Sequence, residues 1–188
     1  RQRQMCIRDS GIYYGEVLSN MLDIYLAYQT AGWDVPKLMF FTNTRSGDVV
    51  AQLYRNVYRR GKYDSLWFRG SGEKPMIIAW EEELTEPMRE FFAVRPPQWP
   101  EAEYDPAGWP YVEKVRPQRL FTNLMSVSVA QHTGDAFSFS VQGVNGGINE
   151  SWGRGYTSEN PVNGNVDAIL RGDNFQEQWN TALAEDPE

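Results

Sequence analysis

The strongest constraint on the fold is an alternation between apolar runs of strand length and segments with helical periodicity. Residues 37–42 and 75–80 are mostly apolar runs bounded by turn-forming residues, and helical patterns lie on both sides of the first run. Two parallel strands need a long crossover, which is usually a helix. The order therefore predicts an α/β fold built on a parallel sheet.

Start and stop residues frame the expected helices. The first covers residues 15–31 and ends before Gly32. The second begins at Ser46, whose side chain can accept hydrogen bonds from the free N–H groups of the first turn, and ends at Gly61. A short helix is expected to open at Thr85, because Glu86 and Pro87 follow it. The apolar stripes of the two longer helices are Leu18, Met21, Leu22 and Tyr25, and Val50, Leu53, Tyr54 and Val57.

Two further strands are predicted at residues 91–95 and 125–131. The loops at 96–119 and 140–172 are longer than compact domains usually contain without a functional reason, so we expect the functional site there. A last helix begins at Asp173. Its expected buried face is Phe175, Trp179, Ala182 and Leu183.

Residues 1–10 have neither a helical nor a strand period and resemble a translated linker or assembly scar. We therefore expect them to lie outside the fold, and residues 11–188 to form one incomplete domain. The 188 residues are fewer than the roughly 250 of a complete (β/α)₈ barrel.

Composition excludes several classes of function. The formal net charge is -7 and no basic stripe is present, so no nucleic-acid partner is expected. No apolar run approaches the roughly 20 residues of a membrane span. Cys6 and His132 are the only residues of their types, which leaves no disulfide framework and no Cys/His zinc site. The glycine-rich residues 143–147 lack the spacing of a phosphate loop. Because the chain has neither a Cys/His site nor a phosphate loop, we expect no metal and no cofactor.

Blocks along most of residues 12–188 resemble bacterial barrel glycosidases related to the endo-α-mannosidase and mutanase-like group. The blocks are Leu38–Asn43, Tyr63–Phe68 with Lys74–Ile78, Met125–Gln131, Gly153–Thr157 and Asn174–Trp179. The resemblance implies a partial (β/α)₈ TIM-type barrel with parallel strands and long βα loops. It also implies a secreted or periplasmic bacterial protein, with its signal peptide missing upstream. In such proteins a strand after the last helix carries a Trp-Asn-Glu-Trp type motif, which this chain lacks.

Polar residues that follow predicted strands are the first candidates for chemistry, because the carboxyl ends of barrel strands face the active site. Glu81 follows one strand directly and is the candidate acid or base, although the run Glu81–Glu83 also suits a solvated helix start. His132 is the second catalytic candidate, although a lone histidine is often a satisfied core residue. Candidate sugar-binding residues at strand ends are Asn43, Trp80 and Gln131.

Aromatic side chains gather in both long loops, and sugars bind to aromatic faces beside polar partners. The first loop contributes Trp109, and the second contributes Trp152, Arg154 and Tyr156 as candidate carbohydrate-binding residues. The alternative is that these rings fix the loops to the barrel wall.

These patterns predict a glycoside hydrolase that cleaves polysaccharide or glycan bonds by carboxylate acid/base catalysis. Two alternatives stay open: a non-catalytic carbohydrate-binding barrel, or a fragment that is inactive because the downstream strand is missing. If the four predicted strands are parallel, Asn43, Glu81, Gln131 and His132 should share one cleft roofed by the loops of Trp109 and Trp152.

Overall fold

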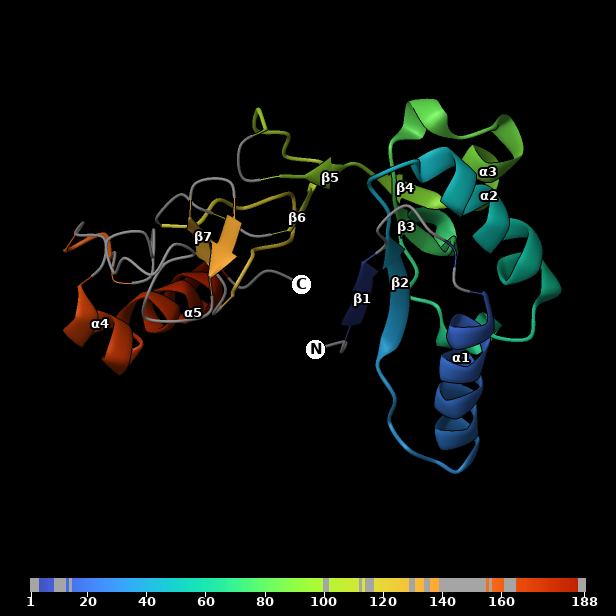
Figure 1. Ribbon diagram of the computed structural model, residues 1–188, viewed down its shortest axis with the longest axis horizontal. Coiled ribbons are helices and arrows are strands. Elements are labelled where there is room, and N and C mark those ends of the chain that lie inside the picture. The colour runs from blue at the N-terminus through green and yellow to red at the C-terminus, as the bar shows by residue number, and fades with distance from the viewer. Residues whose placement is uncertain are drawn as a thin grey trace. The chain divides into compact units, whose positions relative to one another are not determined.

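The computed structural model divides the chain into two compact units, Arg1–Pro97 and Gln98–Glu188 (Figure 1). The residues that the structure describes are 4–8, 13, 15–99, 102–111, 113, 117–128, 131–133, 136–138, 155, 157–160 and 165–185.

The first unit contains a four-stranded parallel sheet whose strands follow one another in chain order. The strands are β1 (Gln4–Arg8), β2 (Lys37–Phe41), β3 (Met76–Ile78) and β4 (Ala93–Arg95). The predictions of an α/β class and of parallel strands are confirmed for this unit. The described strands do not close into a barrel.

Strand β1 corrects the expectation that residues 1–10 lie outside the fold. Gln4–Arg8 runs parallel to β2, with Gln4 opposite Lys37 and Arg8 opposite Phe41. An edge strand needs only one neighbour and is joined to it by backbone hydrogen bonds, so no side-chain period was required for this pairing.

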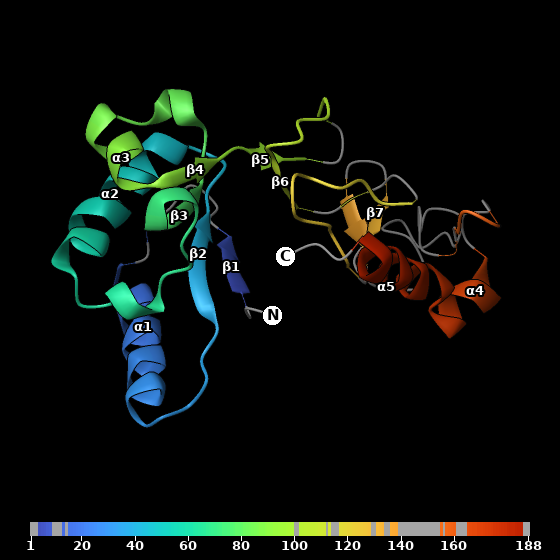
Figure 2. The same cartoon turned by 180° about the vertical axis from the view of Figure 1, so that it is seen from behind.

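Helices cover one face of this sheet (Figure 2). They are α1 (Gly15–Thr30), α2 (Ser46–Asn56) and α3 (Glu86–Phe91), joined by 3₁₀ turns at Tyr58–Arg60 (η1), Asp64–Leu66 (η2), Ser71–Glu73 (η3) and Glu81–Glu83 (η4). All three helices are close to prediction. Gly61 has a φ of 69°, which explains why glycine ends the second helical segment.

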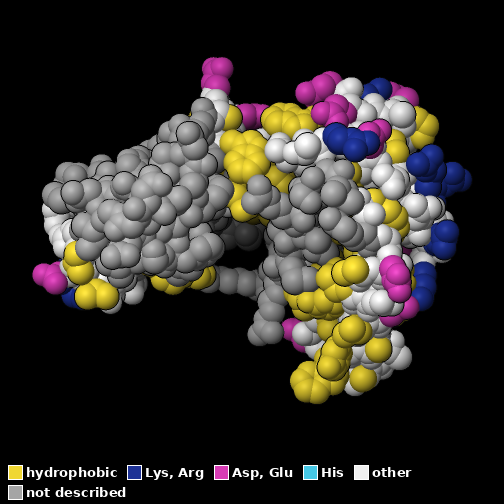
Figure 3. Space-filling view, viewed as in Figure 1, with side chains coloured by type: hydrophobic (Ala, Val, Ile, Leu, Met, Phe, Trp, Pro, Cys, Tyr) yellow, Lys and Arg dark blue, Asp and Glu magenta, His cyan; other side chains and the backbone are white. Residues whose placement is uncertain are grey.

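The outer side of α1 exposes apolar side chains (Figure 3). Tyr28 is 53% exposed and Trp33, just after the helix, is 67% exposed. Their rings pack edge to face with centroids 6.1 Å apart.

The two faces of the sheet alternate along each strand, as the strand period of two requires. Leu38 and Phe40 of β2 pack in the core beneath the helices together with Ile77 of β3. Met39 and Phe41 point to the opposite face and are also buried. The side chains of residues that follow Phe41 in steps of two are therefore expected on the face away from the helices.

The second unit differs more from prediction. The predicted parallel strand at residues 125–131 is wrong, because residues 125–128 form no strand. Instead, β7 (Gln131–Thr133) pairs antiparallel with β8 (Ala136–Ser138). The remaining elements are β5 (Pro97–Gln98), which pairs with β6 (Trp109–Pro110), and the helices α4 (Val166–Arg171) and α5 (Asp173–Glu185).

Helix α5 buries Asn174 and Gln178 together with Ala182, the one buried member of the predicted apolar face. Trp179 and Leu183 are 43% and 53% exposed, whereas Asn174 and Gln178 are 3% and 1% exposed. Gln178 Oε1 accepts a hydrogen bond from the Ser128 N–H at 2.9 Å, and Gln178 Nε2 donates to Asn174 Oδ1 at 2.7 Å and to the Ser128 carbonyl at 3.2 Å. These bonds hold Ser128 against α5 and make burial of the amides favourable.

Replacing Gln178 with Ala should lower the free energy of unfolding by roughly 2 to 4 kcal/mol, because it leaves a cavity and unpaired backbone groups at Ser128. Gln176→Ala on the exposed side of the same helix should change it by less than about 0.5 kcal/mol. Urea denaturation measures both. Equal stability of the two variants would contradict a structural role for the buried amide.

Candidate functional site

Asn43 and Trp80 come together at the carboxyl end of the parallel sheet. Phe41 of β2 is aligned with Ile78 of β3, and Asn43 and Trp80 each lie two residues further along their own segment. The Trp80 indole Nε1–H donates to Asn43 Oδ1 at 3.3 Å, and both side chains are half-buried. Of the predicted strand-end residues, these two are adjacent as expected. We call this edge the rim, defined by Asn43 and Trp80.

A buried hydroxyl pair fixes the backbone beneath the rim. The oxygens Thr42 Oγ1 and Ser46 Oγ lie 2.6 Å apart, and Thr42 Oγ1 also donates to the Ile78 carbonyl at 2.9 Å. The Trp80 N–H donates to Ser46 Oγ at 3.2 Å. Thr42 and Ser46 are both fully buried. Ser46 thus joins α2 to β2 and β3, and the prediction that it caps its own helix is wrong.

The three glutamates after Trp80 have different roles. They form the turn η4, and Glu83 Oε2 accepts a hydrogen bond from the Gly47 N–H at 2.8 Å in the first turn of α2. This carboxylate satisfies a free donor and lies at the positive end of the helix dipole. A side chain at Gly47 would meet the Glu83 carbonyl oxygen at 2.3 Å, so glycine allows this close approach. Glu83 thus caps α2, which comes earlier in the chain, and not the helix that follows the run, as the sequence suggested.

Glu81 is exposed in the same turn and directly follows Trp80. Its backbone carbonyl accepts a hydrogen bond from Arg89 at 3.4 Å, which links the turn to α3. The structure therefore puts a carboxylate next to the rim, and a catalytic role for Glu81 stays a prediction.

The reasoning that placed Gln131 and His132 at a parallel strand end is wrong. Both residues lie within β7, where Gln131 is opposite Ser138 and His132 is opposite Phe137 in an antiparallel pair. The side chains of Gln131 and His132 lie outside the described part of the chain. Trp152, Arg154 and Tyr156 also lie outside the described residues.

The aromatic loop at residues 96–119 is largely packed on itself. The rings of Trp99 and Tyr111 lie 5.0 Å apart, and Arg119 stacks over Tyr104 at 5.0 Å. Trp109 is half-buried in β6. These contacts lie within the loop itself, and a carbohydrate-binding role for Trp109 stays a prediction.

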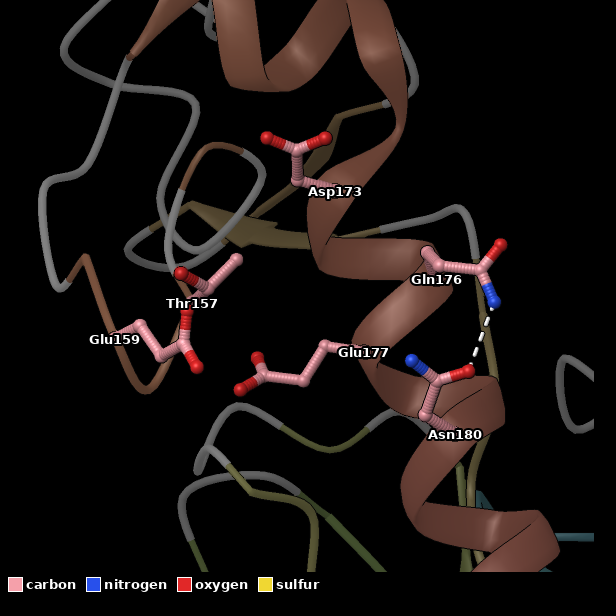
Figure 4. Close-up of a pocket in the computed structure, with 6 residues that line it drawn as sticks. All are labelled: Thr157, Glu159, Asp173, Gln176, Glu177 and Asn180. Atoms are coloured by element: carbon pink, nitrogen blue, oxygen red, sulfur yellow. Dashed lines mark hydrogen bonds between the residues drawn. The ribbon is translucent and has the colours of Figure 1, made fainter.

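A polar pocket of about 330 Å³ lies beside α5 in the second unit (Figure 4). Glu177 Oε1 accepts a hydrogen bond from the Ser158 N–H at 2.8 Å, while its Oε2 is buried without a partner among the described residues. The sequence reasoning missed this pocket, because it read α5 by its apolar residues alone. The pocket is lined by Thr157, Glu159, Asp173, Gln176, Glu177 and Asn180.

Comparison with known proteins found no matching family model, curated protein or solved structure. Among the described residues, no helix has both the length and the apolar character needed to cross a bilayer. Within that same part of the chain, no cluster of three or more His, Cys, Asp or Glu side chains is arranged to hold a metal ion.

Glu83→Ala should lower the free energy of unfolding by about 0.5 to 2 kcal/mol, the usual cost of losing a helix cap. Glu82→Ala is the matched control, because Glu82 is exposed in the same turn and should change stability by less than about 0.5 kcal/mol. Thermal and urea unfolding of both variants test the assignment. A larger loss in the Glu82 variant would contradict it.

Proposed function

We propose that this chain is a carbohydrate-active domain of the (β/α)-barrel glycoside-hydrolase type, with its sugar-binding site at the rim. The observation that carries the proposal is the hydrogen-bonded Asn43–Trp80 pair at the carboxyl end of the parallel sheet. In open and closed α/β folds alike, ligands bind at this end of the strands.

The sheet of the first unit is compatible with part of a barrel wall. Its parallel strands follow chain order, and helices cover one face only. In a barrel the other face points to the interior, and its last residues point into the active site. In such a barrel Asn43 and Trp80 would take this position, since they continue the series that begins with Met39 on β2 and Met76 on β3.

The chemistry of the rim suits a sugar. An indole ring offers a flat apolar face to the C–H groups of a pyranose, and an amide and a carboxylate bind its hydroxyls. The hydrogen bond to Asn43 limits rotation of the indole, so the Trp80 side chain loses less conformational entropy when a ligand binds. Glu81, next along the chain, supplies a carboxylate for proton transfer.

Glycosidic cleavage usually requires a second carboxyl group. In the glycosidases that this chain resembles, a later strand carries it. The alternative function is a carbohydrate-binding domain without catalysis. It is favoured by the engagement of Glu83 in a helix cap, which removes one carboxylate of the run from chemistry.

Trp80→Ala should weaken binding of soluble neutral oligosaccharides, tested as a panel, by about 10-fold or more. Tenfold corresponds to about 1.4 kcal/mol, the range expected for the loss of an aromatic stacking surface. Trp33→Ala removes an exposed indole elsewhere and should leave the affinity unchanged. Calorimetric titration measures both. Equal affinity of the two variants would show that the rim is not part of the sugar-binding site.

Glu81→Gln should lower the rate of reducing-end release by roughly 10²-fold or more while leaving oligosaccharide affinity nearly intact, if Glu81 acts as acid or base. Glu82→Gln is the control in the same turn. Binding without hydrolysis in the unmodified protein would support the non-catalytic alternative. Hydrolysis that is unaffected by Glu81→Gln would assign the acid/base role to another residue.

A further inference from the structure

Arg89 of α3 reaches back to the turn η4, which carries Glu81. Its Nη1 donates hydrogen bonds to the main-chain carbonyls of Leu84 and, at 3.4 Å, of Glu81. We propose that Arg89 is a positioning residue that fixes this turn and so holds Glu81 for proton transfer at the rim. This inference rests on the proposed function and adds to it the residue that orients the acid or base.

The guanidinium group of Arg89 divides its donors between two neighbours. Nε and Nη2 donate to Glu86 Oε2 within α3, at 3.2 and 2.9 Å. Nη1 is directed to the turn, where it bonds both carbonyls. Arginine can serve both neighbours because its N–H donors lie in one rigid plane, whereas lysine is a point charge on a flexible stem. The position therefore requires arginine rather than any cation.

The turn η4 needs support from outside. Its internal main-chain hydrogen bonds run from the Glu83 N–H to the Trp80 carbonyl at 3.1 Å and from the Leu84 N–H to the Glu81 carbonyl at 3.0 Å. Such short 3₁₀ turns have poorer hydrogen-bond geometry than α-helices, and the three adjacent glutamates are exposed and repel one another. Arg89 brings a positive charge to the turn and gives the Glu81 carbonyl a second donor.

Arg89 is itself held in place by α3. Its N–H donates to the Thr85 carbonyl at 3.1 Å, and its neighbour Met88 packs in the hydrophobic core together with Leu84 of the turn. The side chain of Arg89 is 35% exposed, so its hydrogen bonds are partly shielded from water. The guanidinium group is therefore a fixed support for the turn.

Other contacts of the turn lead to α2. The Trp80 N–H donates to Ser46 Oγ, and the Gly47 N–H donates to the Glu83 carboxylate. Arg89 adds the contact to α3 and reaches the main chain of Glu81 itself. Loss of the Arg89 side chain should consequently leave Trp80 in place while Glu81 becomes free to move.

Proton transfer is more sensitive to such movement than sugar binding is. An acid or base must lie within hydrogen-bond reach of the reacting oxygen, and a displacement of about 1 Å can lower the rate by about 10²-fold. Sugar affinity depends on the indole of Trp80 and the amide of Asn43, which are bonded to each other. A positioning role therefore predicts a lower kcat with a nearly unchanged KM.

The kinetic test uses the full chain and the neutral oligosaccharide of the panel that the unmodified protein hydrolyses fastest. Arg89→Lys and Arg89→Met should each lower kcat by about 10-fold or more and change KM by less than about twofold. Added guanidinium chloride at millimolar concentration should restore part of the activity of Arg89→Met. The matched control is Arg60→Met, which removes an exposed arginine elsewhere and should keep the kcat of the unmodified protein.

A second measurement reports on the turn without requiring activity. Amide hydrogen exchange of the Leu84 N–H, which donates to the Glu81 carbonyl, should be about 10-fold or more faster in Arg89→Met than in the unmodified protein. The Arg60→Met variant should exchange at the original rate. An unchanged rate in Arg89→Met would show that the turn does not depend on Arg89 and would overturn the inference.

The outcomes separate this inference from the proposed function. If Glu81→Gln is inactive while Arg89→Met keeps its kcat, or loses affinity as much as turnover, the positioning role is overturned and the proposed function stands. Full activity in Glu81→Gln overturns the inference, because Arg89 then has no acid or base to position. If the unmodified protein hydrolyses no member of the panel, the inference fails, and sugar binding that is lost in Trp80→Ala still supports the non-catalytic alternative.

Discussion

The geometry of the first unit depends on the buried hydroxyl pair of Thr42 and Ser46. This pair joins the end of β2 to the start of α2, and it accepts the backbone N–H of Trp80 where β3 ends. A hydroxyl both donates and accepts, so the pair satisfies several backbone groups that would otherwise be buried without partners. The indole of Trp80 and the carboxylates that follow it are positioned by these small side chains.

The sequence predicted β2, β3 and the three helices of the first unit well because these elements have clear periods and end signals, which β1 lacks. Residues 37–42 and 75–80 are apolar on both faces, as strands covered on both sides must be. The second unit was predicted poorly because its core is partly polar. The alternation in residues 125–131 suggested a strand, yet residues 125–128 form none. Ser128 is held by the amide of Gln178, a long-range contact that no local period reveals.

The candidate site was predictable where position along a strand was sufficient. Asn43 and Trp80 were expected at strand ends, and they are hydrogen-bonded there. The bond from Gly47 to Glu83 joins residues 36 positions apart, so the sequence alone could not separate Glu83 from Glu81.

The amide-rich interior of the second unit has a thermodynamic consequence. Exposure of apolar surface raises the heat capacity on unfolding, whereas exposure of polar surface lowers it. Among the described residues, the first unit buries phenylalanine, leucine and isoleucine side chains, whereas the second buries Gln118, Asn174 and Gln178 beside Phe121. The stability of the second unit should consequently vary less steeply with temperature, so cold would weaken the two halves of the chain to different extents.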